Sequence, residues 1–252
     1  MALESTFETL SLHAWLLAMG AAFIQGLSKS GIKGTAVLSV TLMALAIGAR
    51  QSTGLLVPLL IFGDVFAVIY YHRHARWNYI WKFLPWMVFG ILLGVWLGKD
   101  LPEAVFKWAM AAIILGSIAI MAWWDLRKSE HVPKHWTFAG FVGSLAGFTT
   151  MVGNLAGAFA NIYFLAMRLP KNAFIGTAAW LFLIINVFKL PFHIFVWETI
   201  NTETLRINLW LLPALGLGLL CGIWLVRRIR EGIFRRLILI LTALGAVMML
   251  LR

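Results

Sequence analysis

Two lysines and three glycines interrupt an otherwise apolar sequence near the start of the chain, in the stretch 25–34, Gln-Gly-Leu-Ser-Lys-Ser-Gly-Ile-Lys-Gly. Ammonium and hydroxyl groups donate hydrogen bonds to the oxygens of an anion, and glycines let backbone N–H groups approach such a ligand. We therefore predict an anion-binding segment made of Ser28, Lys29, Ser30, Gly31, Lys33 and Gly34. The alternative is that both lysines are ordinary cytoplasmic loop residues.

A second glycine-rich break spans residues 147–157, Gly-Phe-Thr-Thr-Met-Val-Gly-Asn-Leu-Ala-Gly. It carries no charge, but its threonine hydroxyl groups and asparagine amide can bind the same anion from the opposite side. We predict that this break completes the site with Thr149, Thr150, Gly153 and Asn154. Alternatively, the small residues here only permit close packing between helices.

Three polar residues, Asp64, Asn186 and Lys189, lie deep inside apolar segments. A carboxylate in such a segment is costly, so a functional role is the default interpretation. Asn186 lies three residues before Lys189 and shares its helix face. We predict that Asp64 and Lys189 form a buried pair that couples anion binding to proton uptake, and that Asn186 and Lys189 contact the substrate. The alternatives are that Lys189 extends its ammonium group to the membrane surface and that Asp64 is purely structural.

The composition is that of a membrane protein. Of the 252 residues, 62% are hydrophobic and 12% are charged, with a mean hydropathy of +0.88, whereas soluble domains carry about 25% charged residues. The net charge of +11 comes from basic residues between apolar segments, where they set orientation in the bilayer rather than bind nucleic acid. The chain has a single cysteine, its His72/His74 pair has no acidic neighbours, and it carries no recognisable catalytic motif. We therefore predict no metal site, no cofactor and no enzymatic activity.

Ten apolar segments are separated by polar or glycine-rich connections. About 20 residues are needed to span a bilayer as a helix, and six segments are long enough. The other four are short and come in adjacent pairs, each joined by one of the two breaks. The long segments are 53–71, 79–98, 106–124, 172–192, 207–226 and 232–251, and the short ones are 11–27, 35–49, 136–150 and 157–168.

The chain is an internal duplication. Pro85, Gly90, Gly94, Trp96 and Leu97 recur with the same spacing as Pro213, Gly218, Gly222, Trp224 and Leu225. A second alignment matches Gly31, Gly54 and Asp64 with Gly153, Gly176 and Asn186. We predict one integral membrane domain with a first repeat, residues 1–125, and a second repeat, residues 126–252. Each repeat would hold one broken or re-entrant helix pair and three transmembrane helices.

Equivalent loops of the two repeats differ in charge. Residues 72–76 are basic, whereas their counterpart around Glu198 and Glu203 is acidic; the loop 99–107 is balanced, whereas its counterpart 227–236 is strongly basic. Because cytoplasmic loops are enriched in Lys and Arg, we predict that the repeats have inverted topology and that both termini are periplasmic. The loops assigned to the cytoplasm are 72–76, 125–135, 168–171 and 227–236.

Inverted repeats with paired broken helices are typical of secondary transporters, which bind substrate near the middle of the membrane. We therefore predict an all-α polytopic secondary transporter for a small anion, with protons as the candidate coupling ion. The alternatives are an uncoupled anion channel or uniporter and, third, a membrane enzyme. The expected partners are the anionic substrate and the lipid bilayer, and the sequence does not indicate an oligomeric state.

Several motifs resemble those of the TauE/SafE sulfite-exporter family. They are Gly26-Leu-Ser-Lys-Ser-Gly31, Pro58-Leu-Leu-Ile-Phe-Gly-Asp64 followed by Tyr71-His-Arg-His, Leu84-Pro85 with Gly90 and Gly94, and Gly176-Thr177 through Asn186 and Lys189. The resemblance covers nearly the whole chain. Members of that family are bacterial inner-membrane and plant transporters linked to export or uptake of sulfite, sulfoacetate and other sulfur-containing organic anions. The resemblance implies a multi-pass protein of the bacterial inner membrane whose substrate is a sulfur oxyanion or organosulfonate.

Overall fold

The computed structural model describes residues 10–30, 32, 34–127, 136–167, 169–225 and 240, and every regular element within these ranges is a helix. The helices are α2 (Leu12–Lys29), α3 (Thr35–Ile47), α4 (Ala49–Tyr71), the 3-10 helix η1 (His72–His74), α5 (Trp77–Gly98), α6 (Glu103–Arg127), α7 (Trp136–Gly153), α8 (Ala156–Ala166), α9 (Lys171–Phe195) and α10 (Thr202–Leu225). The predicted all-α fold is confirmed for this part of the chain.

Five helices, α4, α5, α6, α9 and α10, are long and apolar enough to cross a membrane. Each coincides with one of the long segments predicted from the sequence. The sixth, 232–251, lies outside the described residues apart from position 240. The shorter helices form two adjacent pairs, α2 with α3 and α7 with α8, as predicted for the two broken pairs.

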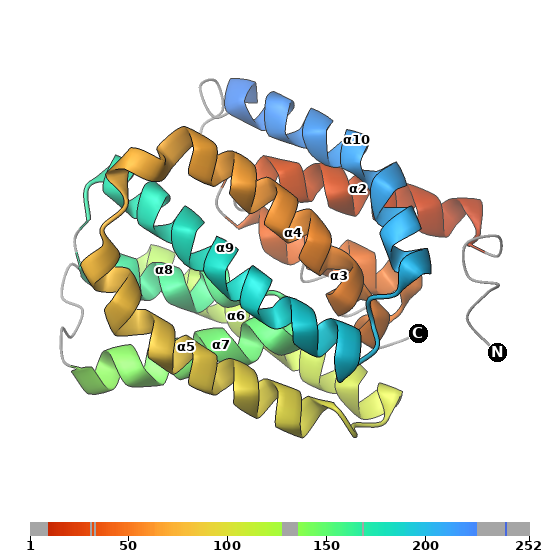
Figure 1. Cartoon of the computed structure of the whole chain (residues 1–252), viewed down its shortest axis with the longest axis horizontal. Helices are drawn as coiled ribbons and strands as arrows, with labels where there is room; N and C mark the ends of the chain where they lie inside the picture. The colour runs from red at the N-terminus through yellow and green to blue at the C-terminus, as the bar shows by residue number, and fades with distance from the viewer. Residues whose placement is uncertain are drawn as a thin grey trace.

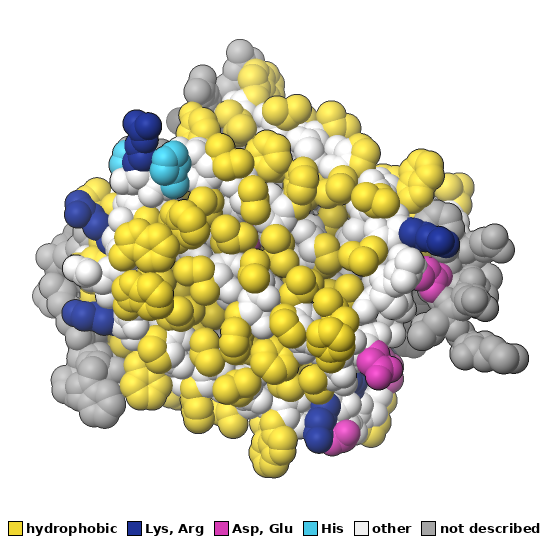
Figure 2. All heavy atoms as spheres, in the orientation of Figure 1, with side chains coloured by type: hydrophobic (Ala, Val, Ile, Leu, Met, Phe, Trp, Pro, Cys, Tyr) yellow, Lys and Arg dark blue, Asp and Glu magenta, His cyan; other side chains and the backbone are white. Residues whose placement is uncertain are grey.

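Hydrophobic side chains cover much of the face of the bundle that is drawn in Figure 2. Figure 2 shows a broad hydrophobic belt, with Lys, Arg and His side chains at its left end and both acidic and basic side chains at its right end. Trp96, Trp108 and Trp210 are each more than half exposed. Within an apolar 18-residue stretch of each of the five candidate spans, 28–61% is buried inside the protein. An apolar surface of this extent is expected where a protein faces lipid.

The two helices α4 and α9 run side by side through the middle of the bundle in opposite directions (Figure 1). On one side of them α2 packs against α10, and on the other side α5 packs against α7. The connection from α4 to α5 and the connection from α9 to α10 lie at opposite ends of the bundle (Figure 1). The central pair therefore separates two peripheral pairs, and each broken hairpin contributes one helix to a peripheral pair.

Glycines bring the backbones of α2 and α10 into direct contact. A Cβ atom added to Gly218 of α10 would lie 2.0 Å from the carbonyl oxygen of Phe23. A Cβ atom added to Gly26 of α2 would lie 2.2 Å from the carbonyl oxygen of Leu215. Any larger residue at either position would force these two helices apart, because backbone atoms cannot move aside as a side chain can.

Glycines bring the backbones of α5 and α7 into contact in the same way as those of α2 and α10. A Cβ atom on Gly90 would lie 2.0 Å from the carbonyl oxygen of Ser144, and one on Gly147 would lie 2.0 Å from the carbonyl oxygen of Met87. Gly90 and Gly218 are aligned positions of the internal duplication. In both pairs the first helix of a broken hairpin thus packs at backbone distance against a long helix from the other half of the chain.

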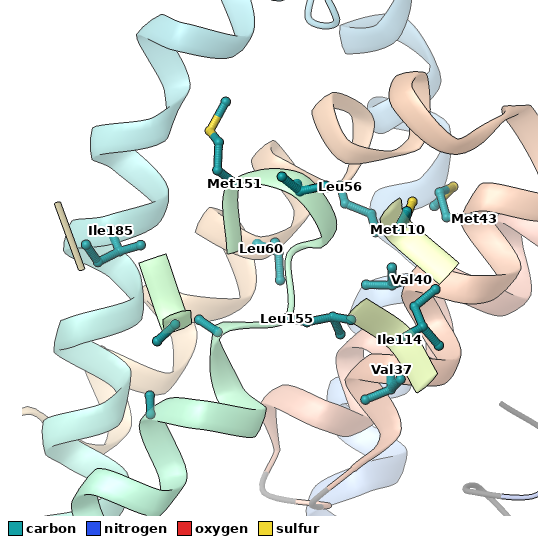
Figure 3. Packing of buried hydrophobic residues seen from close by; sticks show 14 of the residues in the cluster. Val37, Val40, Met43, Leu56, Leu60, Met110, Ile114, Met151, Leu155 and Ile185 are labelled. Atoms are coloured by element: carbon teal, nitrogen blue, oxygen red, sulfur yellow. The ribbon is translucent and has the colours of Figure 1, made fainter. Parts of the chain in front are cut away.

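The segment between α7 and α8 lies inside the protein rather than on its surface. Leu155, in this segment, is 2% exposed, and its side chain points toward Ile114 of α6 and Val37 of α3 (Figure 3). These side chains belong to the main hydrophobic core. Non-helical backbone at membrane depth requires such a protein environment, because its N–H and C=O groups cannot be satisfied in lipid.

Candidate functional site

The first break begins at the end of α2. The N–H group of Ser30 donates to the Gly26 carbonyl oxygen over 3.1 Å, and Gly34, with a φ of 89°, precedes the first residue of α3. Glycine adopts a positive φ at little cost, so Gly34 allows the chain to reverse between the two helices. The reversal leaves Lys29 on the last turn of α2, with 12% of its side chain exposed.

Lys29, Asp64 and Asn186 form a polar group, here named the Asp64 cluster. Lys29 Nζ donates to Asp64 Oδ1 over 2.5 Å, and Asn186 Nδ2 donates to Asp64 Oδ2 over 2.6 Å. The Asp64 residue is 1% exposed. Lys29 fits because Gly63 has no side chain: a Cβ atom there would lie 2.8 Å from Lys29 Cγ. The ring of Phe182, with its centroid 5.6 Å from Lys29 Nζ, covers the ammonium group.

The predicted direct pair between Asp64 and Lys189 is wrong, because the ion-pair partner of Asp64 is Lys29. The sequence places two lysines within plausible reach of this carboxylate. The choice between them depends on how α2 is rotated about its axis, which the apolar pattern does not fix. Asp64 and Asn186, which the internal duplication aligns, are in direct contact with each other.

The second break is organised by Asn154, whose φ of 56° lies in the left-handed region. Asparagine tolerates this conformation better than most residues. The Asn154 N–H donates to the Thr150 carbonyl oxygen over 3.1 Å, and the Leu155 N–H donates to that of Thr149 over 3.3 Å. Asn154 Nδ2 donates to the Thr53 carbonyl oxygen of α4 over 2.9 Å. Asn154 therefore both ends α7 and ties the break to α4.

Lys189 lies against this same end of α7. Its Nζ donates to the Thr150 carbonyl oxygen over 3.0 Å, to Thr150 Oγ1 over 3.1 Å and to Asn154 Oδ1 over 2.7 Å. We name these three residues the Lys189 cluster. Lys189 is 0% exposed, so its ammonium group does not extend to the membrane surface. Within the described residues Lys189 makes no ion pair, and the carbonyl end of a helix supplies only about half a negative charge.

The two clusters are joined along α9, because Asn186 and Lys189 lie one helical turn apart on the same face. The residues of the two clusters together are named the polar path. The first break supplies Lys29 to it, and the second break supplies Thr150 and Asn154. Residues predicted from both breaks are thus brought together through α4 and α9. The second break is not an ordinary surface loop, since Thr150 and Asn154 are buried.

Other predicted residues lie beside these clusters without joining them. The hydroxyl groups of Ser30 and Thr149 donate to backbone carbonyl groups of their own helices. Ser28 is half-buried near the end of α2, and Gly153 is the last residue of α7. Two more predicted residues, Gly31 and Lys33, lie outside the described residues.

Three buried residues next to the clusters were missed in the sequence. Thr53 supplies the carbonyl group that binds Asn154. Gln25 lies one turn before Lys29 and His193 one turn after Lys189, and both are buried. Gln25 Nε2 and His193 Nε2 have no hydrogen-bond partner among the described residues. Their spacing of four residues from a membrane lysine is the signal that could have found them.

No group of three His, Cys, Asp or Glu side chains that could hold a metal ion occurs in the described ranges. His72 and His74 are exposed at the end of α4. The two clusters consist of ammonium, amide, hydroxyl and carboxylate groups and one backbone carbonyl group, which can form ion pairs and hydrogen bonds.

A family model described as sulfite exporter TauE/SafE matches residues 14–249. The chain belongs to the TauE/SafE family. The match includes both breaks and both clusters. TauE/SafE proteins form a family of membrane transporters, and this member is a multi-pass membrane protein with several apolar helices of spanning length. Searches of curated proteins and of solved structures found no significant match.

Proposed function

We propose that this TauE/SafE protein is a secondary transporter that moves a sulfur oxyanion or organosulfonate, such as sulfite or sulfoacetate, across the bacterial inner membrane. The substrate class is supported by the description of the family as sulfite exporters. The preference for an anion is supported by the charges of the two clusters. Proton coupling through Asp64 is part of the proposal.

The observation that carries the proposal is the buried ammonium group of Lys189, which has no carboxylate partner in the described part of the chain. Lys29 and Asp64 neutralise each other, whereas Lys189 contacts neutral oxygens. Burial of an ion costs several kcal/mol unless it is paired, and ionisable residues at membrane depth usually serve function. An anion bound beside Lys189 would supply the missing negative charge. The helix α8, which begins at Ala156 just after Asn154, would add the positive potential of its N-terminus.

We also infer that residues 1–125 and 126–252 are inverted-topology repeats. The matched glycine contacts of the two peripheral pairs support this, and so does the contact between the aligned residues Asp64 and Asn186. The basic residues at 72–76 favour a cytoplasmic location for that end of the bundle. Residues 1–9, 128–135, 226–239 and 241–252, which carry the predicted periplasmic termini and most of two predicted cytoplasmic loops, lie outside the described residues.

Cysteine labelling tests this topology. In a Cys221→Ser background, His74→Cys is expected to react with a membrane-impermeant maleimide only from the cytoplasmic side, and Asn201→Cys only from the periplasmic side. The reason is that the connections holding these positions lie at opposite ends of the bundle (Figure 1). The Cys221→Ser protein is the blank. Labelling of both positions from one side would contradict the inverted arrangement.

Calorimetric titration of the purified protein with sulfite and sulfoacetate tests the function. The unaltered protein is expected to bind at least one of them, and Lys189→Met is expected to weaken that binding about 10- to 150-fold, because a charge-assisted contact is lost. Lys82→Met, which removes an exposed lysine of α5, is the matched control and should bind like the unaltered protein. Absence of binding to both anions, or equal binding by Lys189→Met, would contradict the proposal. Product formation by the purified protein would instead indicate the membrane enzyme.

A further inference from the structure

His193 is a fully buried histidine on the face of α9 that carries the polar path. It follows Asn186 and Lys189 at spacings that place all three side chains on one side of the helix. It lies on the side of Lys189 nearer the connection between α9 and α10, which the proposed topology makes periplasmic. Its exposure is 0%, and its Nε2 atom has no hydrogen-bond partner among the described residues.

The chain that follows α9 folds back to hold this imidazole in place. The N–H groups of Thr199 and Ile200 donate to the His193 carbonyl oxygen over 2.9 Å and 3.2 Å. The ring of Trp197 packs edge-on against the imidazole, with 5.3 Å between the centroids. Glu198 adopts a φ of 52°, a conformation rarely seen outside glycine and asparagine, to make this turn. Strained backbone of this kind is commonly found at functional sites.

The Thr199 side chain also contacts the imidazole. Its Oγ1 lies 2.9 Å from His193 Nδ1. It occupies space left by Gly54 of α4, since a Cβ atom on Gly54 would lie 2.4 Å from this hydroxyl oxygen. The ring of His193 is therefore held by one hydrogen bond to Thr199 and by packing against Trp197, both in the segment that follows α9, and among the described residues its Nε2 has no partner.

The Thr199 hydroxyl group is in a position to set the tautomer of His193. This group has one hydrogen, which can go to Nδ1 at 2.9 Å or to the His193 carbonyl oxygen at 3.5 Å. When the hydroxyl group donates to Nδ1, a neutral imidazole carries its proton on Nε2, and this is the tautomer that the proposal below uses. Leaving a buried N–H group without an acceptor is costly, so an acceptor is expected to reach it in some state of the protein.

We propose that His193 Nε2–H binds an oxygen of the transported anion while another oxygen of the same anion contacts the Lys189 ammonium group, with Thr199 as the residue that orients the imidazole. This inference rests on the proposed anion transport and extends it. It assigns a second contact, on the periplasmic side of Lys189, to an anion that has at least two oxygens. Sulfite and sulfonates meet this requirement.

Two substitutions of His193 distinguish a role of Nε2 in anion binding from a role of the side chain in the structure. His193→Asn keeps a polar atom near Nδ1, where Thr199 bonds, but has none at Nε2; His193→Gln places an amide nitrogen near Nε2. In titrations with sulfite and sulfoacetate, His193→Asn is expected to raise the Kd about tenfold or more, because a hydrogen bond to a charged oxygen is lost. His193→Gln is expected to retain most of the affinity.

The outcomes also distinguish this inference from the proposed function. Unchanged affinity in His193→Asn, or equal losses in the Asn and Gln variants, would overturn the role of Nε2 while leaving anion binding in place. Absence of binding by the unaltered protein would overturn both. If His193→Asn does not fold, Thr199→Val provides the test: it keeps the imidazole but removes the hydroxyl that orients it, so binding should weaken, and unchanged binding would overturn the proposal.

Discussion

Proteoliposomes that contain the Asp64→Asn variant are expected to exchange substrate across the membrane but not to accumulate it against its gradient when a pH gradient is imposed. Asp64 is neutralised by Lys29, which lies at the edge of the first break. An anion that draws the Lys29 ammonium group away would leave a buried carboxylate without a cation, and such a carboxylate takes up a proton. Anion binding and proton uptake would then be linked. An asparagine can make hydrogen bonds at this position but cannot take up the proton.

The measurement compares counterflow exchange with gradient-driven uptake of the same sulfur anion. Asp100→Asn, which changes an aspartate whose side chain is 84% exposed, is the matched control and should keep both activities. An Asp64→Asn protein that still accumulates substrate with unchanged pH dependence would show that Asp64 is a structural residue. Gradient-independent flux in the unaltered protein would instead favour the uncoupled channel or uniporter.

The Lys29→Met variant is expected to lose about 3–5 kcal/mol of stability, because it leaves the buried carboxylate of Asp64 without its cation. The double variant Lys29→Met with Asp64→Asn should recover most of this loss, since it removes both charges together. Unfolding titrations of the two single variants and the double variant give the interaction energy as a double-mutant cycle.

Lys82→Met serves again as the control, because it removes a lysine that makes no ion pair among the described residues. Two results would contradict the expected stabilising role of the pair. One is a Lys29→Met protein as stable as the unaltered protein. The other is a double variant less stable than Lys29→Met.

Much of the fold was accessible from the sequence, because the bilayer limits what an apolar segment can do. Segments of about 20 apolar residues become spanning helices, and glycine-rich stretches between shorter segments become breaks. The second break was correctly placed because a glycine-rich stretch joins two apolar segments that are each too short to span the bilayer. The helix boundaries differ by a few residues from the predicted segments: α7 continues to Gly153, and the hydroxyl group of Thr149 donates within this helix.

The site was less accessible, because side-chain partners depend on the rotation of each helix. Asp64 was correctly identified as a buried polar residue, but its partner is Lys29 rather than Lys189. His193 was missed since a histidine near the end of an apolar segment is indistinguishable from an interfacial one. Whether this histidine is buried or interfacial depends on the chain after α9, in which Thr199 folds back to bind the imidazole.

The first helix of each broken hairpin packs against a long helix from the other half of the chain. This arrangement constrains the order in which the helices can pack during synthesis. Gly147 of α7 packs against Met87, which has already been made when α7 emerges. Gly26 of α2 packs against Leu215, which is made only near the end of translation. The second hairpin can therefore settle as soon as it is inserted, whereas the first must remain without its closest neighbour until α10 arrives. The contact between α2 and α10 cannot form before α10 has been synthesised, so the hairpin made first completes its packing last.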